Sequence, residues 1–247
     1  MFRWLNIAAF VGMALVNILA NALPIAGVKT EEIAARYQNL LSPADYTFMI
    51  WGVIYFLLAG FVLFQASKKR AHITEKCSWW FVLSCVFNSA WMILWHHDLI
   101  AMSIWCMVLL LLSLIEINHR LRKERQGWME KTWVQAGFGL YFGWVTVATV
   151  LNVTSWLVRI RWNALGIAPY LWAMAVLVLC ALLALAVLYR YRNVWYGAAV
   201  IWGIIGIIVQ RIKEYQAQSG WVIAAGAAAL LILLWPMYRA AKQPVLE

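Results

Sequence analysis

Eight long runs without a charged residue dominate the sequence. They cover residues 4–28, 46–67, 77–97, 99–115, 132–158, 162–189, 193–210 and 215–238. A helix needs about 17–25 apolar residues to cross the hydrocarbon core of a bilayer, and each run has that length or slightly more. Because 65% of the 247 residues are hydrophobic and only 12% are charged, an ordinary soluble domain is excluded. The sequence therefore predicts an all-α integral membrane protein with eight transmembrane helices.

The basic residues are distributed unevenly between the predicted loops. With the N-terminus inside, 14 Lys and Arg residues fall on the cytoplasmic side and 6 on the opposite side. The net charge of +10 therefore follows the positive-inside rule and does not indicate a nucleic-acid partner. We expect the first apolar run to be retained as a helix rather than cleaved as a signal peptide. Both termini are predicted to be cytoplasmic, in a bacterial inner (plasma) membrane.

Three of the predicted helices carry aromatic side chains at helical spacing. Residues separated by three, four or seven positions share one face of a helix. Such stripes usually fill space between helices, but three of them, two carrying an asparagine, also suit the walls of a lipophilic ligand pocket. The ten candidate ligand-binding residues on these stripes are Phe48, Trp51, Tyr55, Asn88, Trp91, Trp95, Tyr141, Trp144, Ala148 and Asn152.

The stretch from Ser42 to Tyr55 is a turn that becomes a strongly apolar helix, and we interpret it as the mouth of this pocket. The loop before it, Gly27 to Asp45, is the longest connection on the outer side. Its run from Glu31 to Tyr37 has the composition of a short helix that would lie over the mouth as a lid. A solvated connector is the alternative, since long loops often serve only to connect.

Polar and small residues inside the predicted helices indicate tight packing. Asn6, Asn17 and Asn21 are costly in lipid unless they face other helices, so the first helix is predicted to lie within a bundle. Gly139 and Gly143 form a GxxxG motif, which lets a neighbouring helix approach closely, either within the protein or across a homodimer. The last three predicted helices show packing features of this kind and no readable chemistry.

The sequence predicts no metal site, no catalytic residue and no required cofactor. The four cysteines occur singly in apolar runs, at Cys77, Cys85, Cys106 and Cys180, and are interpreted as small core residues. The cluster that most resembles a metal or haem site is His96-His97-Asp98. It falls in a tight outer turn, where polar residues are expected, and no nearby segment supplies further ligands.

Residues 1–158 resemble the tryptophan-rich sensory protein / translocator protein family (TspO/MBR, peripheral benzodiazepine receptor). The second-helix pattern of that family is matched by Pro43, Phe48, Trp51 and Tyr55. The third-helix pattern is matched by Asn88 and Trp91. The fifth-helix pattern is matched by Tyr141, Trp144, Val145, Ala148, Thr149 and Asn152. The positions that depart from the family pattern are Ala44, Tyr46 and Leu140.

The resemblance implies a five-helix transmembrane bundle over residues 1–158 and a three-helix extension over 159–247, in an extended and divergent member. It also implies a pocket, capped by the first loop, for flat lipophiles such as porphyrin, haem or sterols. We therefore predict a membrane-embedded sensor or binding protein whose partners are the bilayer and a tetrapyrrole-like molecule.

Two other functions are open to such a chain. One is a transporter or exporter of a small lipophile, which the lack of an ionisable residue at any predicted helix centre disfavours. The other is an enzyme, for which the sequence offers no nucleophile–base pair and no phosphate-binding loop.

Overall fold

The computed structural model describes residues 2–23, 27–28, 30–67, 70–122 and 127–242, and these form helices and connecting turns. In chain order the elements are α1 (Phe2–Ala22), α2 (Thr30–Arg36), the 3-10 helix η2 (Asp45–Met49), α3 (Ile50–Gln65), α4 (Ala71–His96), α5 (Ile100–Leu121), the π-helix η4 (Glu130–Ala136), α6 (Gly137–Arg159), the 3-10 helix η5 (Ala164–Gly166), α7 (Pro169–Tyr191), α8 (Val194–Lys213) and α9 (Ser219–Lys242). The predicted all-α fold is confirmed.

Within the described residues, seven helical segments are long and apolar enough to cross a membrane. They are Phe2–Ala20, Asp45–Gln65, Ile100–Leu121, Glu130–Arg159, Pro169–Tyr191, Val194–Lys213 and Ser219–Lys242. An eighth span exists if Ala71–Cys77 and Trp79–His96, which are bent by 54° relative to each other, are counted together. The bent span corresponds to the predicted third helix, so the sequence and the structure agree on the set of spans.

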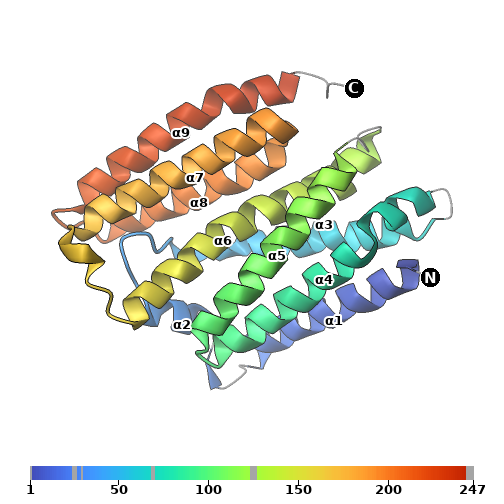
Figure 1. Ribbon diagram of the computed structural model, residues 1–247, viewed down its shortest axis with the longest axis horizontal. Coiled ribbons are helices and arrows are strands. Elements are labelled where there is room, and N and C mark those ends of the chain that lie inside the picture. Colours follow the sequence, from blue (N-terminus) through green and yellow to red (C-terminus); the bar gives the residue numbers. More distant parts are fainter. Residues whose placement is uncertain (1, 24–26, 29, 68–69, 123–126, 243–247) are drawn as a thin grey trace.

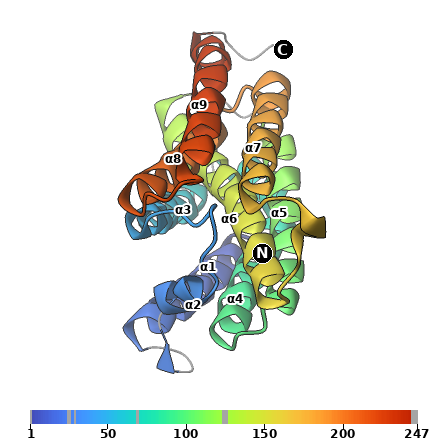
Figure 2. The same ribbon diagram turned by 90° about the vertical axis from the view of Figure 1, so that its left-hand side faces the viewer.

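The helices form a bundle with α3 and α6 in its middle. In both views α7, α8 and α9 group on one side, whereas α1 and α4 lie on the other (Figures 1 and 2). The described chain begins and ends at the same end of the bundle (Figure 1). The short helix α2 lies at the opposite end, so the predicted lid and the described ends of the chain are at different ends of the bundle (Figure 1).

The asparagines of α1 face neighbouring helices, as predicted. The amide nitrogen of Asn6 donates to Oε1 of Gln65 in α3 at 2.9 Å, and the amide nitrogen of Asn17 donates to Oδ1 of Asn88 in α4 at 2.8 Å. All four side chains are buried. The side chain of Asn21 lies outside the described part of the chain. These bonds hold α1 inside the bundle, because lipid offers no alternative partner for an amide.

The GxxxG motif of α6 packs against α8 of the same chain. A methyl group at Gly143 would overlap the backbone carbonyl of Tyr196 and lie 2.9 Å from the Cβ of Ala199, both in α8. A methyl group at Gly139 would lie 3.0 Å from the amide nitrogen of Asn193, just before α8. Of the two alternatives left open by the sequence, packing inside the protein is therefore correct for this motif. A homodimer stays a prediction and would need another surface.

Helix α8 also holds the turn before α3. The backbone N–H of Ala44 donates to the carbonyl of Gly206 at 3.0 Å, and the indole N–H of Trp202 donates to the carbonyl of Thr47 at 2.9 Å. The ring of Tyr46 meets that of Trp202 edge-on, with centroids 5.5 Å apart. Helix α8 thus positions the turn that leads into α3. The division of the chain at residue 158 stays a prediction.

The replacement Gly143→Ala is expected to destabilise the fold by about 1–3 kcal/mol, because the added methyl group meets the backbone of α8, which cannot rotate away. The matched control is Gly12→Ala in α1, where the space around the added Cβ is open and stability should stay the same or rise slightly. Thermal unfolding of both variants in one detergent measures the difference. Equal losses in the two variants would contradict the close packing of α6 on α8.

Candidate ligand-binding site

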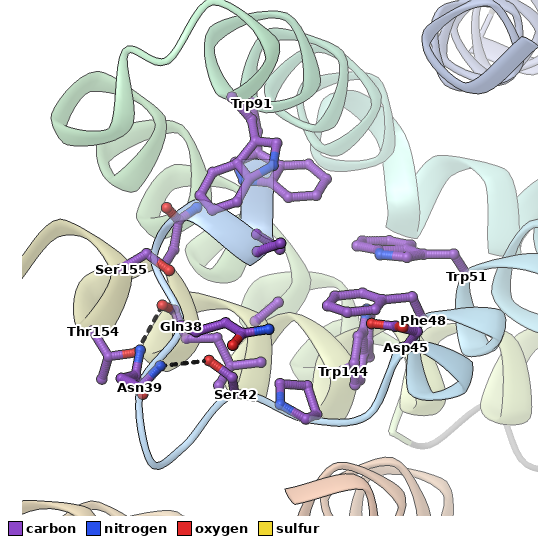
Figure 3. Close-up of a pocket in the computed structure, with 17 residues that line it drawn as sticks. Gln38, Asn39, Ser42, Asp45, Phe48, Trp51, Trp91, Trp144, Thr154 and Ser155 are labelled. Atoms are coloured by element: carbon purple, nitrogen blue, oxygen red, sulfur yellow. Dashed lines mark hydrogen bonds between the residues drawn. The ribbon is translucent and has the colours of Figure 1, made fainter. Parts of the chain in front are cut away.

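A cavity of about 90 Å³ lies where the start of α3 meets α4 and α6, beneath α2. The predicted site residues that line it are Phe48, Trp51, Trp91, Trp95, Trp144, Ala148 and Asn152. Figure 3 shows the rings of Phe48, Trp51 and Trp144 gathered at one end of the cavity, and the polar side chains of Asn39 and Thr154 at the other. The carboxylate of Asp45 lies beside Phe48 at the ring end, so polar side chains occur at both ends of the cavity.

Trp51 is the centre of the ring cluster. Its ring stacks on Trp91 of α4, with centroids 5.7 Å apart and an interplanar angle of 29°. It also stacks on Tyr55 of its own helix at 5.5 Å. Tyr141 and Trp144 of α6 meet it edge-on at 6.0 and 6.3 Å. The three stripes found in the sequence therefore converge on one side chain.

Three of the ten predicted residues lie behind the cavity instead of lining it. The hydroxyl of Tyr55 donates to Oδ1 of Asn17 at 2.8 Å, and Asn17 in turn bonds Asn88. Tyr141 is fully buried against Trp51. These side chains form a layer that supports the ring cluster. The assignment of ligand contacts to all ten residues stays a prediction.

Trp51 also borders a second, more open cavity between α1 and α3, with a volume of about 550 Å³. Its lining consists of Ala14, Asn17, Ile18, Ala22, Trp51, Gly52 and Tyr55. Trp51 therefore belongs to the walls of both cavities.

Two indole N–H groups in the cavity wall have no partner among the described residues. Trp144 is fully buried and Trp91 is 6% exposed, and the Nε1 atom of each is buried without a hydrogen bond. An unsatisfied buried donor costs about 1–3 kcal/mol. The side chains of both tryptophans belong to the cavity lining.

The loop before α3 covers the cavity, as expected of a lid rather than a solvated connector. Its residues in the cavity lining are Ala34, Ala35, Gln38, Asn39, Ser42, Pro43 and Asp45. The amide nitrogen of Asn39 lies 3.4 Å from the hydroxyl of Thr154 in α6, and the backbone N–H of Asn39 donates to Ser42 Oγ at 2.9 Å (Figure 3). The lid therefore rests directly on α6.

The sequence reasoning missed the polar residues of the lid and the last turns of α6. The missed α6 residues in the lining are Leu151, Thr154 and Ser155. Leu151 and Ser155 continue the stripe of Trp144 and Ala148 at helical spacing, so a longer reading of that stripe would have found them. The lid residues follow no periodic pattern that the sequence could show.

A family model described as TSPO-like protein matches residues 3–237 of the chain. The chain belongs to the TSPO-like family. The matched stretch includes α7, α8 and α9, so the family model itself covers the last three helices. Comparison with curated proteins and with solved structures gave no match. Family membership and the apolar helices together identify an integral membrane protein of the sensor or binding type.

In this TSPO-like protein the lid is tied to the far wall through Tyr37. The hydroxyl of Tyr37 donates to Oδ1 of Asp98 at 2.6 Å and accepts a bond from Arg159 at 2.8 Å, and Arg159 also pairs with Asp98. Burial alone would raise the pKa of Asp98. The hydrogen bonds from Tyr37 and Arg159, with the positive charge of Arg159, outweigh it and hold this pKa below its usual range. The Asp98 carboxylate is therefore charged at neutral pH and closes the lid.

The turn between α4 and α5 has structural partners for its polar side chains. His96 is buried, with Nδ1 2.9 Å from the carbonyl oxygen of Met92, and Asp98 is held by the lid and Arg159. Among the described residues no three His, Cys, Asp or Glu side chains are arranged to hold a metal ion. Asp98 thus belongs to the lid contact of the TSPO-like site.

The replacement Asp98→Asn is expected to loosen the lid, because it removes the carboxylate that pairs with Arg159 and accepts from Tyr37. An exposed pair of this kind is worth about 0.2–1 kcal/mol, so opening should increase by up to about fivefold. Hydrogen exchange of the backbone amides of α2 measures the opening. Glu116→Gln, which breaks the exposed pair with Arg120 in α5, is the control and should leave α2 unchanged.

The same contact predicts a pH dependence. Because the pKa of Asp98 is lowered in the folded state, the contact is fully present above the ordinary carboxyl pKa of about 4. It is lost as the pH falls through the lower folded pKa. In wild-type protein, α2 exchange corrected for its intrinsic pH dependence should rise only in that acidic range. Identical corrected exchange in Asp98→Asn and wild-type protein at neutral pH would show that the contact does not hold the lid.

Proposed function

We propose that this TSPO-like protein is a membrane-embedded sensor or binding protein for flat lipophilic ligands of the tetrapyrrole class, such as porphyrin or haem. The observation that supports the proposal is the cavity walled by Trp51, Trp91 and Trp144. The indole N–H groups of Trp91 and Trp144 are buried and have no partner among the described residues. Aromatic rings favour offset or edge-on contact with another conjugated ring. An apolar pocket with a few convergent polar groups is the usual setting for such a ligand.

Polar side chains in the cavity lining fit the edge chemistry of such a molecule. Natural porphyrins carry carboxylates along one edge and are apolar elsewhere. Gln38 of the lid and Ser155 of α6 line the cavity and offer an amide and a hydroxyl donor. The amide of Asn39 and the hydroxyl of Thr154 already donate to Tyr37, Thr154 and Leu151. Hydrogen bonds to a charged acceptor are stronger than those between neutral groups. The lid is thus suited to hold the carboxylate edge while the tryptophans hold the ring.

The size of the cavity implies a movement on binding. Its volume of about 90 Å³ is well below the roughly 300–1,000 Å³ of typical ligand pockets. The lid and the indole of Trp51 are the two parts of the wall that can yield. Outward movement of α2, or rotation of Trp51 toward the second cavity of about 550 Å³, supplies the missing space. Binding is therefore coupled to lid opening.

The proposal includes an orientation. The basic residues favour a bacterial inner membrane with both termini on the cytoplasmic side, where the 14 Lys and Arg residues lie. The lid is at the opposite end of the bundle, so the ligand enters from the outer face or from the bilayer (Figure 1). No resident cofactor is part of the proposal, and a homodimer is the proposed assembly.

Protoporphyrin added to the protein in detergent is expected to quench tryptophan fluorescence saturably. Replacing both Trp51 and Trp144 by Ala should weaken its affinity by roughly ten- to a hundredfold, because two ring contacts of about 0.5–1.5 kcal/mol each are lost. Affinity is read from porphyrin absorbance as well, since the variant has fewer fluorophores. The control is Trp105→Ala in α5, whose side chain is 71% exposed on the outside of the bundle.

A further variant separates stacking from hydrogen bonding. Trp91→Phe with Trp144→Phe keeps aromatic rings in the wall and removes the unpartnered N–H donors. It should weaken protoporphyrin binding less than the double alanine replacement does, because the ring contacts remain. Unchanged affinity in the Trp51→Ala, Trp144→Ala protein would show that the ligand does not occupy this cavity.

A further inference from the structure

A separate small cleft, distinct from the two cavities that Trp51 lines, lies at the end of the bundle that carries the termini, far from the lid. It forms where α5 ends, where η4 leads into α6, and where the turn between α7 and α8 comes in. The polar residues in its lining are Asn118, Arg122, Gln135, Arg192 and Asn193. Its volume of about 30 Å³ is enough for one small polar group but not for a whole organic ligand.

A pair of asparagines gives the cleft a fixed frame. The amide nitrogen of Asn193 donates to Oδ1 of Asn118 at 3.0 Å, and the amide nitrogen of Asn118 donates to the carbonyl of Phe138 at 3.2 Å. Oδ1 of Asn193 accepts from the backbone N–H of Tyr196 at 3.2 Å, which caps α8. These amides bond to one another and to the backbone. They therefore shape the cleft, and other groups would contact a bound ligand.

Gln135 supplies an unused donor in this frame. It belongs to the π-helix η4, and its Nε2 atom is buried without a hydrogen-bond partner among the described residues. Such a buried donor is costly unless something accepts from it. Single π-helical turns are rare in proteins overall, and those that occur are often found at functional sites. Here the wide turn puts the neighbours Val134 and Gln135 together in the cleft lining.

The charge around the cleft is positive. Arg122 at the end of α5 and Arg192 before α8 are both half-buried and reach the cleft from opposite sides. The lining contains no Asp or Glu within the described residues, and Glu130 of η4 faces Arg70 at 3.8 Å instead. Two guanidinium groups and an amide donor around a small space are the groups that bind a tetrahedral oxyanion.

We propose that this cleft binds a phosphate group, as presented by the headgroup of an anionic phospholipid. The cleft lies at the ends of membrane-spanning helices, and its lining includes the exposed Trp195; aromatic side chains of this kind mark the headgroup layer. It is also on the side that carries most of the basic residues. Basic pockets between helices on that side of a membrane are suited to phosphate headgroups.

Native mass spectrometry of the full chain in detergent, titrated with phosphatidylglycerol or phosphatidylcholine, tests the proposal. Wild-type protein should retain phosphatidylglycerol at lower concentration than phosphatidylcholine. Arg122→Gln with Arg192→Asn should weaken phosphatidylglycerol binding by more than about tenfold. The backbone at position 192 is left-handed, with φ of 49°. Asn is used there because it tolerates this conformation better than Gln. Gln135→Met, which keeps shape and charge, should weaken it by about five- to tenfold.

The control is Arg239→Gln, which removes an exposed charge from α9 at the same end of the bundle. It should leave retention of phosphatidylglycerol unchanged, and thermal unfolding of every variant in the same detergent checks that the fold is intact. Displacement of the lipid by an excess of inorganic phosphate would support the phosphate site and identify free phosphate as a sufficient occupant; retention in that excess would support the lipid as the occupant. Wild-type retention by the Gln135→Met and double arginine variants, or an equal loss in Arg239→Gln, would overturn the proposal.

Discussion

An amide side chain inside a bilayer must find its hydrogen-bond partner within the protein, and much of this structure follows from that constraint. Asn17 connects α1 to Asn88 of α4 and to Tyr55 of α3. On the other side of the cavity, the hydroxyl of Ser103 in α5 donates to Oδ1 of Asn152 in α6 at 3.1 Å. Breaking either contact would leave a polar group in hydrocarbon without water to replace its partner. The helices around the aromatic cavity are therefore fixed relative to one another.

The position of the ring cluster depends on these hydrogen-bonded helices and also on contacts with α8. Trp51 stands over the Tyr55–Asn17 bond, while the turn before it is held by the bonds from Ala44 and Trp202. The start of α3 is thus positioned by α1 and by α8, from the two ends of the chain. The stretch that matches the TSPO-like family includes α8, which anchors the mouth of the cavity.

Helical spacing predicts which residues share a face, and this was enough to find the aromatic residues of the cavity wall. Spacing gives the direction in which a side chain points but not its depth, so Tyr55, Asn88 and Tyr141 were grouped with residues that line the cavity. The lid contacts of Asn39 depend on the path of a loop, which has no period. The π-helix was invisible for a related reason: its extra residue per turn shifts the register that a search for a 3.6-residue period assumes.

Helix α6 contributes to both polar regions, with Thr154 near the lid and Phe138 at the basic cleft. Between them, Gly139 and Gly143 bring it against α8 so closely that neither helix can slide without a clash. Packed interfaces of this kind resist gradual deformation. The parts of the molecule that can move are the lid, which is held by side-chain bonds, and the indole of Trp51, which lines two cavities. Binding of a flat ligand under the lid should therefore change those two elements and leave the α6–α8 frame, and the basic cleft built on it, as they are.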